Sequence, residues 1–220
     1  EQHFRAAIAL SPRSADAYDC LSGVLLAQNR DVEAAQAARQ AIGLKTDSAL
    51  AHAHLGQALL RLGRHAEALK CCDAALEISP CRPEAWSNKA VALQELGLYE
   101  EALKCLDRAV QVNARYAIGW YNRGRLLGNL GRYDEALKCF DCALSIDPRF
   151  ALAWFNRGVA LEKLGRHEEE AKCYERGLAI DPGEVKAWCN QGVALGRLGR
   201  HEEALKCLDR ALEMSPRHAP

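Results

Sequence analysis

Hydrophobic residues recur along this chain at helical spacing, in two stripes that alternate from one end to the other. In one representative stretch, Trp120, Gly124 and Leu127 follow one another at spacings of four and three, as on one face of a helix. Gly131 then suits the left-handed backbone that follows a helix end, and a second apolar stripe fills 133–144. The pattern predicts a helix of about 14 residues, a tight turn and a second helix of about 13 residues.

This two-helix pattern repeats with a fixed period of 34 residues. The four tryptophans keep the period, at Trp86, Trp120, Trp154 and Trp188. The register holds through six units: 15–48, 49–82, 83–116, 117–150, 151–184 and 185–218. A fixed period in this range indicates an array of stacked units, so we predict one all-α solenoid domain over 15–218 with a short tail at 219–220.

The chain begins in the middle of the pattern. Residues 1–14 fit the second helix of a truncated preceding unit, with Phe4 and Ala7 at its apolar positions. We therefore expect the sequence to be a piece of a longer array. The first full unit, 15–48, departs most from the pattern, with Tyr18 in place of tryptophan and Asn29 in place of the turn glycine.

The unit resembles the tetratricopeptide repeat family. The resemblance is carried by tryptophan, glycine and leucine in the first helix, Gly-x-Tyr-x2-Ala at the turn, and then phenylalanine, alanine and proline at fixed offsets over 34 residues. It implies a right-handed superhelical solenoid of antiparallel helix pairs with a concave groove. It also implies a role in holding other proteins together.

Charge and cysteine content narrow the class of protein. Lysine plus arginine equals aspartate plus glutamate, at 29 each, so no net charge favours nucleic acid or a membrane surface. No apolar run approaches the ~18 residues of a membrane-spanning helix. Five of the ten cysteines occupy one position of the repeat, and equivalent positions in stacked helix pairs lie too far apart for a disulfide. We interpret them as free thiols, which predicts a reducing, cytoplasmic location.

Candidate catalytic and metal-binding groups all fit the repeat instead. Cys139 and Cys142 form a single CxxC, whereas a structural zinc site needs four ligands. His65, His167 and His201 occupy the turn position that holds tyrosine in other units. Every glycine fits a turn or a close helix contact, so no phosphate-binding loop is indicated. We predict no enzyme activity, no metal and no cofactor in this chain.

The resemblance places the first helix of each unit on the concave wall. The position two residues after the tryptophan then faces the groove, and four units carry asparagine there: Asn88, Asn122, Asn156 and Asn190. An asparagine amide both donates and accepts hydrogen bonds. We call these four asparagines the asparagine ladder. The ladder predicts a groove that binds the backbone of a peptide segment.

Neighbouring positions predict an apolar lane with a cationic edge. The lane residues are Tyr121, Leu152, Phe155, Val159 and Val193, and the cations are Arg125, Lys163 and Arg197. An exposed apolar surface of this kind usually marks a binding site. The lysine and asparagine pattern of family members that clamp the carboxylate tail of chaperones is incomplete here, so we do not expect chaperone-tail binding.

One unit breaks the small-residue pattern. In 151–184, Glu170 and Gly177 stand where the other units have alanine. A buried carboxylate is costly unless paired, so Glu170 must reach solvent or a base. The site is either a tolerated local defect or a flexible joint. Because glycine is a poor helix former, we expect Glu170→Ala combined with Gly177→Ala to raise thermal stability.

Three functions are consistent with these features. The first is a non-catalytic scaffold that binds a peptide segment of a partner protein in the groove. The second is the substrate-docking arm of a larger enzyme, such as a protein glycosyltransferase, as the resemblance allows. The third is self-association through an uncapped apolar end of the array.

Overall fold

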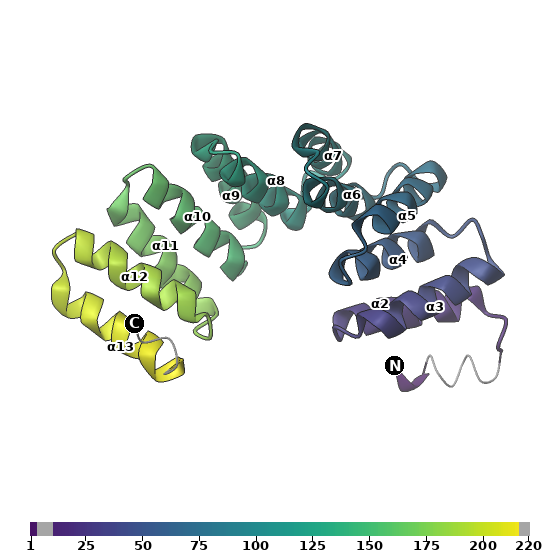
Figure 1. The fold of residues 1–220 in the computed structure, drawn as a ribbon, viewed down its shortest axis with the longest axis horizontal. Coiled ribbons are helices and arrows are strands. Elements are labelled where there is room, and N and C mark those ends of the chain that lie inside the picture. The colour runs from purple at the N-terminus through teal and green to yellow at the C-terminus, as the bar shows by residue number, and fades with distance from the viewer. Residues whose placement is uncertain (4–10, 216–220) are drawn as a thin grey trace. The chain divides into compact units, whose positions relative to one another are not determined.

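The computed structural model describes residues 1–3 and 11–215, and over these residues the chain is built from pairs of helices (Figure 1). The first helices of the pairs are α2 (Ala15–Ala27), α4 (Ala49–Arg61), α6 (Pro83–Glu95), α8 (Ala117–Asn129), α10 (Ala151–Lys163) and α12 (Val185–Arg197). The second helices are α3 (Asp31–Leu44), α5 (His65–Ile78), α7 (Tyr99–Val112), α9 (Tyr133–Ile146), α11 (His167–Ile180) and α13 (His201–Met214). The predicted all-α array of helix pairs is confirmed. The helix predicted within 1–14 falls mainly on 4–10, outside the described residues.

Helix lengths differ slightly from the prediction, because each first helix has 13 residues and each second helix has 14. The first helix ends early because the turn residue closes it. Gly131, at φ +76°, donates its N–H to Gly128 at 3.0 Å, and the next N–H reaches Leu127 at 2.9 Å. Asn29 takes the same left-handed conformation at φ +58°, which explains how the first unit manages without a turn glycine.

Helix pairs group into two compact units, 1–114 and 115–220, which we describe separately. The division falls close to the predicted repeat boundary between 116 and 117. Within each unit, the second helix of one pair packs against the first helix of the next. The single uninterrupted domain stays a prediction.

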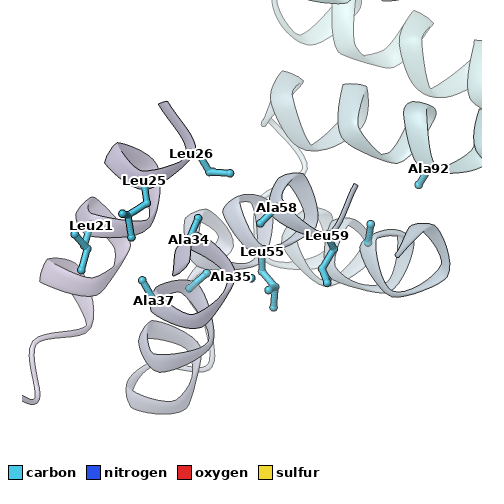
Figure 2. Packing of buried hydrophobic residues seen from close by; sticks show 12 residues of the cluster. Leu21, Leu25, Leu26, Ala34, Ala35, Ala37, Leu55, Ala58, Leu59 and Ala92 are labelled. Atoms are coloured by element: carbon cyan, nitrogen blue, oxygen red, sulfur yellow. The ribbon is translucent and has the colours of Figure 1, made fainter. Parts of the chain in front are cut away.

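The core of the first unit is a layer of leucines and alanines shared by successive helices (Figure 2). Leu21 and Leu25 of α2 meet Ala34 and Ala38 of α3, and Leu59 of α4 continues the layer. Alanine at these contacts lets the helix backbones approach closely, as the repeat pattern predicts.

Large aromatic side chains replace part of this layer in the second unit. The ring of Phe140 lies where a Cβ at Gly124 would be only 2.8 Å away, and the ring of Tyr174 lies 2.9 Å from a Cβ built at Gly158. Phe140 and Tyr174 are almost fully buried. In these two repeats the glycine of the first helix therefore makes room for an aromatic ring from the second helix, whereas in the last repeat Gly192 faces Leu208.

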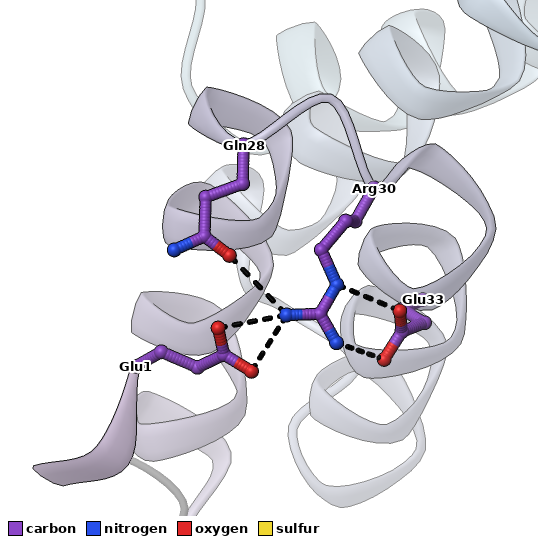
Figure 3. A network of polar contacts seen from close by, with 4 residues as sticks. All are labelled: Glu1, Gln28, Arg30 and Glu33. Carbon is purple, nitrogen blue, oxygen red and sulfur yellow. Dashed lines mark hydrogen bonds and ion pairs between the residues drawn. The ribbon is translucent and has the colours of Figure 1, made fainter.

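Arginine and glutamate clamp the start of most second helices. Arg30 precedes α3 and donates two hydrogen bonds to Glu33, at 2.8 and 2.6 Å, and further bonds to Glu1 at 2.7 Å and Gln28 at 3.3 Å (Figure 3). Four later helices repeat the bidentate clamp: Arg64–Glu67, Arg132–Glu135, Arg166–Glu169 and Arg200–Glu203. The four later pairs are exposed to solvent, and exposed ion pairs add little to stability.

Candidate functional site

The predicted asparagine ladder is divided between the two units. Asn88 lies in α6 of the first unit, whereas Asn122, Asn156 and Asn190 lie in α8, α10 and α12 of the second. The last three therefore belong to one described surface. The contribution of Asn88 to the same groove stays a prediction.

Tyrosine hydroxyls hold two of these amides in place. The Nδ2 group of Asn156 donates to the backbone oxygen of Leu152 at 2.9 Å and to the hydroxyl of Tyr121 at 3.3 Å. The Nδ2 group of Asn190 donates to the hydroxyl of Tyr174 at 3.2 Å. Burial raises the pKa of both tyrosines, so both hydroxyls stay neutral.

These hydrogen bonds limit which groups of the asparagine ladder remain for a ligand. Both N–H groups of Asn156 are engaged within the protein, which leaves its carbonyl oxygen as the group for a ligand. The sequence-based prediction gave the amide both a donor and an acceptor role. The structure favours the acceptor role, because the tyrosine one repeat earlier takes the second donor.

Two hollows adjoin at Asn156 and Val159, which line both of them. The first has a volume of about 290 Å³ and lies between α10 and α12, with Tyr174 of α11 in its wall. The second has a volume of about 200 Å³ and lies between α8, α9 and α10. The predicted site residues in these walls are Arg125, Leu152, Phe155, Asn156, Val159, Lys163 and Asn190.

Apolar exposure along this surface comes from aliphatic side chains. Leu152 is 48% exposed, Val159 38% and Val193 47%. Phe155, predicted to be an open part of the lane, is only 6% exposed and packs with Tyr174 in the core. It forms the floor of the first hollow instead. Tyr121 is likewise turned inward, with its ring centroid 4.9 Å from that of Phe150.

Gly177 explains the burial of Phe155. A Cβ built at Gly177 would lie 2.3 Å from Cε1 of Phe155, much closer than atoms can approach. The contact argues against the Gly177→Ala half of the expected stabilisation, because the ring of Phe155 occupies the space that the added methyl group would need. The stability of the combined Glu170→Ala and Gly177→Ala variant stays a prediction. The sequence-based argument considered only helix propensity and had no means of seeing this neighbour.

Glu170 is buried and contacts two basic side chains, as expected for a carboxylate at a position that holds alanine in the other units. Its carboxylate is hydrogen-bonded to Nδ1 of His167 at 2.9 Å and lies 3.9 Å from Nη1 of Arg197. Burial raises the pKa of Glu170, while the bond to His167 and the charge of Arg197 oppose the rise. Arg197 also donates to Glu162 at 3.1 Å. This network engages Arg197, so it is less available to a ligand than the sequence suggested.

The cationic edge of the two hollows comes from other residues. Arg125 and Lys163 line the second hollow, and Lys186 lines the first, with Glu184 beside it. The ammonium of Lys163 lies 3.9 Å from Glu162 at an exposed position. Lys186 occupies the repeat position of Leu152, and the sequence pattern already places both on the wall of the groove.

Reactive chemistry is sparse in the described parts of the chain. No cluster of three or more histidine, cysteine, aspartate or glutamate side chains there could hold a metal ion. The described cysteines are free thiols, and burial raises the pKa of Cys72 to about 12, which disfavours the reactive thiolate. Nor does any helix within 1–3 and 11–215 have the length and apolar character needed to cross a membrane.

Family models and solved structures agree with this architecture. Tetratricopeptide repeat models match residues 121–185 and also 49–80, 83–116 and 185–218. The matches cover well over half of the chain, which therefore belongs to the tetratricopeptide repeat family. A search of curated proteins found no match.

Three solved structures illustrate the likeness of the fold. PilF of Pseudomonas aeruginosa is 18% identical, with a TM-score of 0.80 over 92% of both chains. A chain of the APC/C hetero-tetramer Cut9–Hcn1 is 16% identical, with a TM-score of 0.87 over 98% of this chain and 43% of that one. YrrB, described as a tetratricopeptide repeat protein with an unusual peptide-binding site, is 25% identical, with a TM-score of 0.58 over 84% of this chain and 95% of its own.

Proposed function

We propose that this chain is a non-catalytic protein-interaction scaffold, and that its second unit binds a peptide segment of a partner protein across α8, α10 and α12. The observation that carries the proposal is the meeting of two hollows at Asn156 and Val159. The amide of Asn156, whose nitrogen is already hydrogen-bonded, lies there beside the exposed side chains of Leu152 and Val159. These are the groups that bind a peptide backbone and its apolar side chains.

The contacts suggest how the segment would lie. A backbone N–H of the peptide donates to the carbonyl oxygen of Asn156, because the amide nitrogen is already engaged. An apolar side chain enters the first hollow, against Leu152 and Val159. A second side chain enters the other hollow, where Arg125 and Lys163 favour an acidic group.

Family membership and fold support this function in general terms. YrrB, which shares the fold, is described as having a peptide-binding site. The exposed aliphatic side chains at Leu152, Val159 and Val193 are apolar surface that a bound peptide would cover.

A peptide display library panned against the purified chain tests the proposal. Val159→Glu places a charge where the two hollows meet, and Leu205→Glu is the matched control. Leu205 is 61% exposed in α13 and lies outside both hollows. We expect selected peptides to bind the parent and the Leu205→Glu variant equally, and the Val159→Glu variant at least about tenfold more weakly.

Circular dichroism must first show that the variants keep the helicity of the parent. Equal binding by all three proteins would place the interaction elsewhere and contradict the proposal. Failure to select any peptide from the library would also count against it.

A further inference from the structure

A separate and larger hollow lies on the side of the second unit formed by α11 and the turn between α9 and α10. Its volume is about 680 Å³. Pro148 and Arg149 come from the turn, Trp154 from α10, and Lys172 and Arg176 from α11. None of these residues lines either hollow of the candidate peptide site. The proposed function therefore makes no use of this surface.

Two arginines in this hollow stand apart from most others in the unit. Among the described arginines of this unit, ion pairs with carboxylates are formed by Arg132, Arg157, Arg166, Arg197, Arg200 and Arg210. Arg149 and Arg176 have no carboxylate within ion-pair distance among the described residues. The guanidinium of Arg176 instead lies 5.8 Å from the ring centroid of Trp154.

The remaining wall is aromatic and apolar. The indole N–H of Trp154 donates to the backbone oxygen of Pro148 at 3.0 Å, which fixes the ring at the mouth of the turn. Ala179 and Ile180 of α11 continue the wall. Glu175 is the single carboxylate that lines the hollow, against three cations. Lys172 is partly neutralised, since its ammonium lies 3.5 Å from Glu168.

Comparison with the next repeat shows that this combination of residues is not shared by it. The positions of Arg149 and Ala179 are occupied there by Gly183 and Glu213. Glu213 pairs with Arg210, the counterpart of Arg176, at 2.9 Å. The equivalent position next to Trp188 therefore carries one arginine that is ion-paired. The hollow next to Trp154 carries two arginines that form no ion pair with the described residues, although Glu175 also lines it.

We propose that the hollow beside Trp154 binds an anionic group, a carboxylate or a phosphate, carried by a peptide segment next to an apolar side chain. Arg149 and Arg176 supply planar donors that suit either oxyanion. The apolar neighbour packs on Trp154 and Ile180. A peptide held here would leave the Asn156 surface free, so the unit would contact its partners through two separate sites.

The test follows the tryptophans of the full chain by fluorine NMR. Replacing tryptophan with fluorotryptophan gives four resonances, one for each tryptophan, which single Trp→Phe variants assign. The probes are three short peptides that carry two glutamates, two phosphoserines or two glutamines beside a leucine. Each is titrated to about 1 mM, a range that detects weak binding. The first two separate the carboxylate from the phosphate source, and the third lacks the charge.

We expect a charged peptide to shift the Trp154 resonance in a saturable way and the glutamine peptide to leave it unchanged. Arg149→Gln combined with Arg176→Gln should weaken binding at least about tenfold. Arg210→Gln, at the equivalent position of the next repeat, should have no effect, nor should Val159→Glu in the other site. The proposal is overturned if no charged peptide shifts Trp154, if Trp188 responds equally, or if the double variant binds as well as the parent.

Discussion

Replacing Gly177 with alanine is the sharpest test of how the second unit is packed. Gly177 lies within α11, where alanine would normally stabilise the helix by about 1 kcal/mol. The structure predicts the opposite sign. The added Cβ would lie 2.3 and 2.5 Å from two ring carbons of Phe155, and the ring is 6% exposed and packed against Tyr174 and Leu178.

The magnitude follows from two opposing effects. The ring has to move by roughly 1 Å to restore contact distance, and overpacking of a well-filled core costs about 1–3 kcal/mol. The gain in helix propensity offsets about 1 kcal/mol of this. We therefore expect Gly177→Ala to lower the free energy of unfolding by about 1 kcal/mol.

A double-mutant cycle with Phe155→Ala isolates the contact. In the Phe155→Ala background the methyl group has space, so Gly177→Ala should now stabilise the chain by up to about 1 kcal/mol. The double variant reproduces a pair that the chain already contains, because Ala53 and Ala75 occupy the same two repeat positions and share a buried cluster. Urea unfolding followed by circular dichroism measures all four proteins.

Gly196→Ala is the control for helix propensity. A Cβ at Gly196, in α12, would have no neighbouring atom within 4 Å, so this substitution should raise stability. If Gly177→Ala stabilised the parent as much as Gly196→Ala does, the reasoning from the Phe155 contact would be refuted.

Three further predictions concern charge, backbone and thiols. Burial raises the pKa of Glu170, so the contribution of Glu170 to folding stability is most favourable at acidic pH and is lost as pH rises through the folded-state pKa. Glu170→Gln should therefore stabilise the chain at pH 7. Urea unfolding should show this advantage shrinking as the pH is lowered toward 4. A constant advantage across this range would contradict the titration. At the left-handed turn of Gly131 (φ +76°), alanine should cost about 1 kcal/mol and asparagine less, as thermal unfolding can measure. With a thiol reagent under native conditions, exposed Cys81 should react quickly and buried Cys72 only on unfolding; rapid labelling of Cys72 would show that the core opens.

Much of the candidate surface was visible in the sequence because it depends on repeat position. The 34-residue period placed Asn122, Asn156 and Asn190 on equivalent turns of three helices, and the structure puts all three in the second unit. Aliphatic exposure at Leu152 and Val159 was predicted for the same reason. Phe155 lines the first hollow but is buried there rather than open. Its side chain turns toward Gly177, 22 residues away, and periodicity does not describe side-chain direction.

The sequence by itself determined the properties that depend on neighbours along the chain: the helix pairs, their small-residue contacts and the left-handed turn residues. Only the tertiary structure decided which polar groups are already satisfied. Tyr121 and Tyr174 hold the asparagine amides, and Arg197 joins the network around Glu170. Arg149 and Arg176 line their hollow without forming an ion pair to any residue that the structure describes. The physical reason is that hydrogen bonds and ion pairs depend on side-chain conformations across different helices, and a repeat pattern constrains the backbone far more than it constrains those conformations.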